Sequence, residues 1–325
     1  MPICISCTTQ TPYLYTVYES ANNLRLEECS SCHAFADPYV EHDNLVLFID
    51  LILLKRGVYR HLLFNRGTEP RRSGSENKGK EREDAGYNRE KKRWLLVMRL
   101  GSALVILDAC ELGVSSCNPH RLTYYRPRGP ADDSPPWNHD DGVAFLRVLL
   151  GCLAETAIFH GGIIFACHIM LSIQRFLSSR GYGVASSASP GIRSEFRLSL
   201  IPLSLFYSSL TKLFLLFLLS IWRPATAPIR PSEHILERWD KKAYIAHALQ
   251  LLDDDKIDRE WVVRNVLGGM SAGFALRVIL DSHPLLSMLV ILVGWMAKTG
   301  MARVVSSWVG GDERTGEAWL AYSIP

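Results

Sequence analysis

The sequence predicts a small zinc-binding β domain, a zinc ribbon, followed by short membrane-interface helices and an all-α region that crosses a membrane several times. Two observations predict this class. Two Cys-x-x-Cys pairs, Cys4/Cys7 and Cys29/Cys32, lie near the N-terminus with residues 8–28 between them. Nearly all the long apolar runs lie beyond Trp94, as in a membrane protein, although the chain as a whole is only 48% hydrophobic. The net charge of +3 is too small to favour a nucleic-acid partner.

The four N-terminal cysteines form the expected metal site. Zn²⁺ binds four thiolates tetrahedrally at about 2.3 Å, and two tight turns with paired cysteines supply them. Between the pairs, residues 13–18 and 24–26 flank turn-forming residues 20–23, which predicts a β-hairpin. Two disulfides or four unliganded thiols are the alternatives. No segment resembling a signal peptide precedes the first pair, so we expect a reducing compartment and a metal. The remaining cysteines, which favour buried apolar positions, are Cys110, Cys117, Cys152 and Cys167.

Three short motifs follow the predicted ribbon. They read Ala36-Asp37-Pro38-Tyr39-Val40-Glu41, Phe48-Ile49-Asp50-Leu51-Ile52-Leu53 and Tyr59-Arg60-His61-Leu62-Leu63-Phe64-Asn65. Together with the ribbon, these motifs resemble the Arv family of endoplasmic-reticulum lipid-homeostasis proteins. The close match ends at Asn65, and it departs from the family at Arg56-Gly57, where members often carry a proline.

Residues 45–54 form an apolar helix that is too short to cross a bilayer. Ten residues span about 15 Å, which is half the hydrocarbon thickness. The helix either packs on the ribbon or lies in the membrane interface, and we favour the interface slightly. In that position Lys55, Arg56 and Arg60 would reach lipid phosphates, and Tyr59 and Phe64 would be aromatic anchors.

Residues 66–93 are predicted to be a disordered linker. They are rich in Gly, Ser, Glu, Arg and Lys and contain no Val, Leu or Ile, so the segment cannot bury a core. The basic residues outnumber the acidic ones next to the first predicted membrane segment. This excess predicts that the ribbon faces the cytosol.

The membrane region is predicted to extend over residues 94–308, with four or five helices. Residues 143–173 exceed the length of one crossing, so tilt, a kink near Gly161-Gly162 or extension beyond the bilayer is needed. Gly269 and Gly273 form a GxxxG pattern that would permit close helix contact. The last two segments are either two spans or a re-entrant hairpin plus one span. The predicted divisions are a ribbon at 1–35, the motif segment at 36–65, spans at 94–114, 143–173, 198–222, 261–280 and 285–308, connectors at 115–142, 175–197 and 223–260, and a tail at 309–325.

Several ionisable residues lie in the predicted spans. Asp108 and Glu111 share one helix face, where they either line a polar cavity for a lipid head group or, as we favour, sit at the far interface or pair with Arg147. His160 and His168 lie on broadly the same side of one span. A packed or interfacial role is favoured over metal binding because no third ligand has a fixed spacing. No protease, nucleotide-binding or hydrolase motif is present, so we expect no catalytic residues and no enzyme activity, and Glu155 has no assigned role.

The resemblance to the Arv family implies a multi-pass protein of the endoplasmic reticulum, and secondarily of the Golgi. It implies sterol transport and distribution, with effects on sphingolipid metabolism and on delivery of glycosylphosphatidylinositol precursors. The expected partners are membrane lipids, and the expected cofactor is a structural Zn²⁺ on Cys4, Cys7, Cys29 and Cys32. A membrane-embedded lipid-modifying enzyme, or a scaffold for such enzymes, is the alternative function.

Overall fold

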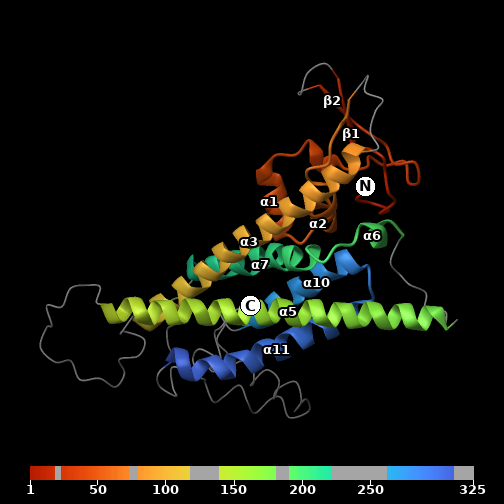
Figure 1. Cartoon of the computed structure of the whole chain (residues 1–325). Coiled ribbons are helices and arrows are strands. Elements are labelled where there is room, and N and C mark those ends of the chain that lie inside the picture. The colour runs from red at the N-terminus through yellow and green to blue at the C-terminus, as the bar shows by residue number, and fades with distance from the viewer. Residues whose placement is uncertain (19–22, 73–79, 118–138, 181–189, 222–261, 311–325) are drawn as a thin grey trace, which may run out of the picture.

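The computed structural model describes residues 1–18, 23–72, 80–117, 139–180, 190–221 and 262–310. Figure 1 shows two parts: an N-terminal head, residues 1–72, and a bundle of longer helices. One long helix, α3 (Lys80–Cys117), runs from the side of the head into the bundle.

The predicted hairpin is present in the head. Strands β1 (Tyr15–Val17) and β2 (Leu24–Leu26) pair antiparallel, with Tyr15 opposite Leu26. A third strand, β3 (Arg71–Arg72), pairs parallel to β1 and was not predicted, because two arginines carry no strand pattern. The sheet order is β2-β1-β3.

Short helices connect the sheet to the bundle. They are η1 (Pro38–Val40), α1 (Asn44–Ile52), α2 (Arg56–Arg60) and the π-helical turn η2 (His61–Asn65). Leu54 takes a left-handed φ of 55° and turns the chain between α1 and α2. A Cβ on Gly57 would lie 3.0 Å from the Tyr39 ring, so this glycine allows the ring to pack on α2. The absence of a proline at this link is therefore compatible with a well-packed turn.

The prediction of disorder over residues 66–93 is wrong for its second half, because α3 begins at Lys80. Arg93 donates to the Leu63 carbonyl at 2.8 Å and forms an ion pair with Glu90 at 3.6 Å. Lys, Glu and Arg are good helix formers, and here they extend a helix whose apolar part starts at Trp94. Composition alone indicated only that this stretch has no core of its own.

The bundle contains the remaining helices. They are α5 (His139–Ser179), α6 (Pro190–Glu195), α7 (Leu200–Ile221), the π-helical η4 (Val262–Leu267), α10 (Gly268–Leu280) and α11 (Pro284–Gly310). Four helical segments of the described chain are long and apolar enough to cross a membrane: Phe145–Phe176, Leu200–Leu219, Val262–Leu280 and Pro284–Ser306. The chain is therefore a membrane protein with several candidate crossings, and the last two segments are both long enough to be spans.

The predicted span 94–114 is helical, as part of α3, but it is not among the four candidates. It carries three ionisable residues, Arg99, Asp108 and Glu111. Helix α5 continues without interruption through Gly161 and Gly162, so the kink is not found. At 41 residues it is about 60 Å long, twice the hydrocarbon thickness. The predicted connector 223–260 and residues 311–325 lie outside the described residues.

Head and bundle share one hydrophobic core. Tyr59, Leu63 and Phe64 from the head are nearly fully buried in the same cluster as Leu203 of α7 and Ile279 of α10. The Tyr59 ring meets the Phe274 ring edge-on, with 5.7 Å between the ring centroids. The head is thus packed onto the bundle rather than tethered to it.

Helices α5 and α11 run side by side (Figure 1), and glycines allow their close approach. A Cβ on Gly294 would lie 2.5 Å from Ile163 Cγ1, and one on Gly162 would lie 3.0 Å from Ala297 Cβ. The predicted contact through Gly269 and Gly273 is not found among the described residues, because a Cβ on either glycine would meet none of their atoms within 4 Å.

This packing predicts that Gly294→Ala destabilises the bundle by about 1–3 kcal/mol, because the added methyl group overlaps Ile163. The matched control is Gly300→Ala in the same helix, where a Cβ meets nothing within 4 Å and the change is expected to be neutral or stabilising. Thermal unfolding of the purified variants in detergent measures both. Equal melting temperatures for the two variants would contradict the close α5–α11 contact.

Candidate functional site

The four N-terminal thiols converge at one end of the head. Their sulfur atoms all lie within 4.8 Å of one another, with 3.7 Å between Cys4 and Cys32 and 3.5 Å between Cys7 and Cys29. A tetrahedral Zn²⁺ with bonds of 2.3 Å requires sulfur separations of about 3.8 Å. All four cysteines are free thiols, and the separations greatly exceed a disulfide bond. The donor set therefore fits a four-thiolate metal site.

The two cysteine pairs form matching turns. The Thr8 and His33 amides donate to the Cys4 and Cys29 carbonyls, each at 2.9 Å. Thr8 and His33 each follow the second cysteine of a pair and take left-handed φ values of 65° and 57°. The same backbone turn thus presents both thiol pairs.

His33 is exposed, and a glycine at this position would adopt the left-handed conformation without the strain that histidine bears. We expect His33→Gly to raise the stability of the head by about 0.5–1 kcal/mol, net of the greater chain entropy of glycine. His33→Ala keeps the strain and should not stabilise. Urea titration of metal retention compares the two variants. A less stable glycine variant would show that the His33 side chain contributes to the site.

The thiols differ in their tendency to ionise. Burial raises the pKa of Cys4 to about 12. Burial also opposes ionisation of Cys7, but hydrogen bonds from the Thr9 hydroxyl and backbone outweigh it and lower the pKa of Cys7 to about 6. Because a metal binds thiolates, capture of an ion must displace the Cys4 proton. Metal affinity is therefore expected to fall as the pH falls.

A buried carboxylate links the cysteine turns to η2. Asp37, which is fully buried, accepts hydrogen bonds from Asn65 Nδ2 and His61 Nδ1, each at 2.7 Å, and from the Tyr39 amide at 3.1 Å. The Asn65 amide also bonds both the N–H and the C=O of Ile3, next to the first cysteine, at 2.9 and 2.8 Å. We call Asp37, His61 and Asn65 the polar lock. It ties the first and third motifs to the thiol site.

Two further motif residues complete this junction. Arg60 donates to the Ile5 and Ser6 carbonyls at 2.6 and 3.0 Å, inside the first cysteine turn. Asp50 accepts from the Tyr39 hydroxyl at 3.0 Å and pairs with Lys55 at 2.7 Å, and the hydrogen bond from Lys55 lowers the pKa of Asp50. The polar residues of all three motifs thus hold the short helices of the head on the thiol site.

The interfacial arrangement predicted for this segment is partly wrong. Tyr59 and Phe64 are 0% and 1% exposed and are core residues, not interface anchors. Arg60 is buried against the first cysteine turn and does not reach lipid phosphate. Helix α1 packs one side on α7, where Thr211 donates to the Ile52 carbonyl at 3.2 Å. The opposite side is exposed and apolar, which agrees with a membrane-facing surface, through Leu45, Phe48, Ile49 and Leu53.

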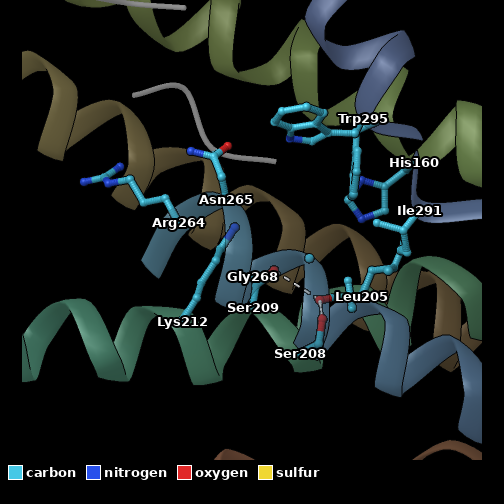
Figure 2. A pocket seen from close by; sticks show the side chains of 13 residues that line it. His160, Leu205, Ser208, Ser209, Lys212, Arg264, Asn265, Gly268, Ile291 and Trp295 are labelled. Carbon is cyan, nitrogen blue, oxygen red and sulfur yellow. Dashed lines mark hydrogen bonds between the residues drawn. The ribbon is translucent and has the colours of Figure 1, made fainter. Parts of the chain in front are cut away.

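A small cavity of about 30 Å³ lies between α5, α7, η4, α10 and α11. Figure 2 shows Lys212, Arg264 and Asn265 on one side of it and His160, Ile291 and Trp295 on the other. Lys212, Arg264 and His160 are 4%, 8% and 9% exposed. We call this space the bundle cavity. Its lining is apolar apart from these groups, Asn265, Ser208 and Ser209.

The ionisable residues of the predicted spans differ in their burial and contacts. His160 is buried and donates from Nδ1 to the Thr156 carbonyl at 2.8 Å, whereas His168 is exposed, so the two do not share a side. Asp108 is buried and lines a smaller pocket beside the cavity together with Lys212. Asp108 therefore does not lie at an exposed interface. The Glu111 side chain lies outside the described residues.

A polar seam runs through the bundle next to the cavity. Lys298 of α11 lies within electrostatic range of Glu155, Asp108 and Lys212, and all four are buried. Sequence reasoning noted Asp108 and Glu155 separately but did not bring them together with Lys212 and Lys298. Because they come from four helices, only the tertiary packing reveals that they converge.

Comparison with known proteins places these features in a family. The model of the Arv1-like family matches residues 3–235, which is more than half of the chain. The "Protein ARV1" of Saccharomyces cerevisiae is 54% identical over 63 residues, 19% of each chain. The protein of the same name from Eremothecium gossypii is 41% identical over 97 residues, 30% of this chain and 31% of that one. The "Protein arv1 homolog" of Dictyostelium discoideum is 47% identical over 66 residues, 20% of this chain and 27% of that one.

The matched stretches thus span less than a third of the length of these relatives. No solved structure matches this chain.

Proposed function

Because the chain belongs to the Arv1-like family, we propose that it acts in lipid homeostasis in the endoplasmic reticulum membrane, through the distribution of sterols inside the cell. One structural observation carries the lipid-handling part of this proposal. The bundle cavity combines apolar walls with buried polar groups, among helices apolar enough to span a membrane. Buried ionisable groups among membrane-spanning helices are costly and are typical of functional sites inside a membrane.

We propose a structural Zn²⁺ in the head, held by Cys4, Cys7, Cys29 and Cys32. Four thiolates complete a tetrahedral coordination shell and leave no position for a reactive water, so the ion would supply folding energy rather than catalysis. The polar lock links the thiol site to η2, whose Leu63 and Phe64 pack in the core shared with the bundle. Zinc is thus proposed to fix the position of the head on the membrane helices.

The head is proposed to face the cytosol. The excess of basic over acidic residues in the stretch 66–93, which leads into α3, supports this orientation. Protease protection of the full chain in sealed microsomes tests it. Digestion of the head without detergent is the expected result, and protection of the head would overturn the orientation.

A test of function uses cells that lack the protein and are complemented with the wild type or variants. We expect sterol to be misplaced between the endoplasmic reticulum and the plasma membrane in the deletion strain and restored by the wild type. Effects on sphingolipids and on glycosylphosphatidylinositol precursors are proposed as consequences of the same defect. Normal sterol distribution in the deletion strain would overturn the proposal.

The alternative is a membrane-embedded lipid-modifying enzyme or its scaffold, which the buried Asp108 and Glu155 would favour. Quantitative lipid analysis of the deletion strain separates the two. An enzyme loss accumulates one substrate and depletes its product, whereas a transport loss changes the location of several lipids. We propose the non-enzymatic role and expect the second pattern.

A further inference from the structure

We propose that α1 is a re-entrant element: its C-terminal end enters the hydrocarbon of the bilayer beside α7, and acyl chains cover its exposed apolar side. This position is deeper than the interfacial one, in which the helix would lie under the lipid head groups. It requires that α7, a candidate span, crosses the membrane, and it does not depend on sterol distribution. Three observations support it: the contacts of the head along α7, the hydrogen bonds at the end of α1, and the side chains that α1 exposes.

The head lies alongside the first half of α7. At one end Gln10, just after the first cysteine turn, donates to Ser194 Oγ at 2.7 Å, six residues before α7 begins at Leu200. At the other end Thr211, the twelfth residue of α7, donates from its hydroxyl to the Ile52 carbonyl at 3.2 Å. Thr211 lies about 17 Å along α7, near the middle of a hydrocarbon layer about 30 Å thick. Figure 1 shows α1 next to α7. If α7 crosses the bilayer, the thiol site stays outside it and the end of α1 lies inside it.

Helix α3 places the membrane boundary on the head itself. Arg93 donates to the Leu63 carbonyl of η2 at 2.8 Å, and the apolar part of α3 begins at the next residue, the exposed Trp94. Tryptophan is typical of the membrane–water interface. Further along α3, a Cβ on Gly101 would lie 2.9 Å from Phe206 Cζ, so α3 continues in contact with α7. A boundary at the level of Trp94 runs beside η2 rather than between the head and the bundle.

The hydrogen bonds at the C-terminal end of α1 suit a position without water. The last four carbonyls of a helix have no partner within it, and water often supplies the missing donors. In hydrocarbon there is no water, and each unpaired carbonyl costs several kcal/mol. In α1 all four accept hydrogen bonds of 3.0–3.2 Å from protein donors: Ile49 from the Leu53 amide, Asp50 from the Lys55 amide, Leu51 from the Leu54 amide and Ile52 from the Thr211 hydroxyl. This helix end therefore needs no water to satisfy its backbone.

The exposed side of α1 is apolar. It consists of Leu45, Phe48, Ile49 and Leu53, and Leu53, which directly follows the helix, is 63% exposed. Toward its own C-terminal end α7 also exposes an aromatic ring, that of Phe217. A contiguous exposed apolar surface is unfavourable in water and marks a contact with a membrane or a partner. Because α1 packs against a candidate span, the acyl chains around that span are the contact we assign.

The charged residues next to this end are compatible with its depth. Asp50 is buried and forms an ion pair with Lys55 at 2.7 Å, and the Tyr39 hydroxyl donates to it at 3.0 Å. The pair is neutral as a whole, which lowers the cost of placing it in a medium of low dielectric constant. Arg56 is exposed at the start of α2, and Arg60 at the end of α2 contacts the first cysteine turn. Helix α2 thus leads back to the head, and the long Arg56 side chain can extend toward the phosphates of the same leaflet.

The first test uses the unmodified chain. The full protein is reconstituted in phosphatidylcholine vesicles in which part of the lipid carries a diazirine near the end of one acyl chain. After illumination, mass spectrometry identifies the labelled peptides. We expect residues 44–55 to be labelled about as strongly as the exposed part of α7 around Phe217. Label on α7 but none on residues 44–55 would overturn the proposal.

The second test compares the depth of single positions. A fluorescent amino acid replaces Leu53 after α1, Phe217 of α7 as the deep reference, or Arg25 of β2 as the aqueous reference, all of which are exposed. The vesicles contain a lipid with a nitroxide quencher either on the head group or near the end of the acyl chain. At Leu53 we expect the acyl-chain quencher to be about twofold or more as effective as the head-group quencher, as at Phe217. The probe at Arg25 should be quenched only by iodide in the water.

Each other outcome of the second test contradicts the re-entrant position. Strongest quenching at Leu53 by the head-group nitroxide would assign α1 to the interface. Iodide quenching at Leu53 equal to that at Arg25 would place the end of α1 in water. A Phe217 probe that the acyl-chain quencher does not reach would show that α7 does not cross. If a substituted chain fails to fold, the peptide map of the unmodified protein decides the question alone. None of these measurements involves sterol, so their failure is distinct from a failure of the proposed function.

Discussion

Replacing one buried cysteine of the thiol site by serine, Cys4→Ser or Cys29→Ser, is expected to abolish stable zinc binding and to unfold the head. A neutral hydroxyl is a poor Zn²⁺ ligand, and structural zinc sites contribute apparent binding energies of about 10–16 kcal/mol to folding. The sulfur cluster joins the two cysteine turns, so the loss of one ligand affects both of them. Because Arg60 and Asn65 hold the first turn, the joint to the bundle should loosen as well.

Metal analysis of the purified full chain, together with sterol distribution in complemented cells, measures this effect. We expect near-stoichiometric zinc in the wild type, little in the two variants, and no complementation by them. Cys110→Ser removes a thiol outside the cluster and should retain both zinc and function. Normal zinc content and normal sterol distribution in the cluster variants would contradict the assignment.

Replacing Asp37 by alanine is expected to destabilise the head by about 3–5 kcal/mol. The change leaves His61 Nδ1, Asn65 Nδ2 and the Tyr39 amide without their buried acceptor. Each unsatisfied buried donor costs about 1–3 kcal/mol, and the three share one network. The cysteine ligands themselves are untouched. Zinc should therefore still bind, but it should be released at lower temperature or urea concentration than in the wild type.

Asp43→Ala is the matched control, because Asp43 is an exposed aspartate that makes no side-chain cap hydrogen bond at the start of α1. Zinc release during a thermal ramp and limited proteolysis of the head report on both variants. We expect the control to behave like the wild type. If the Asp37→Ala protein unfolded at the same temperature as the Asp43→Ala control, the polar lock would not contribute to the stability of the head.

The thiol site could be predicted from the sequence because its chemistry is local. Two Cys-x-x-Cys pairs at this spacing are typical of paired zinc-binding turns, and the alternating residues between them form a hairpin. The apolar helices α5, α7, α10 and α11 were also recognised, since length and composition define a candidate span. These features depend on neighbours in the chain.

The joint between head and bundle could not be predicted, because its partners are distant in sequence. Tyr59 and Arg60 look like residues of a membrane interface until Phe274 and the Ile5 carbonyl are placed beside them. Likewise, GxxxG spacing pointed to α10, whereas the close contact uses Gly162 and Gly294, which lie in different helices. The prediction placed the start of α3 too late in the chain. The charged first half of this helix makes its contacts with the head, and the sequence does not show these contacts.

The most direct test of the central claim, that the head is fixed on the membrane bundle, is an intramolecular cross-link in native membranes. Gln10 Nε2 donates to Ser194 Oγ at 2.7 Å, between the first cysteine turn and α6. A Gln10→Cys, Ser194→Cys protein should form a disulfide under mild oxidation in most chains, as measured by mass spectrometry of the linked peptides. If both new cysteines react with a maleimide and no linked peptide forms, the head does not sit on the bundle as described.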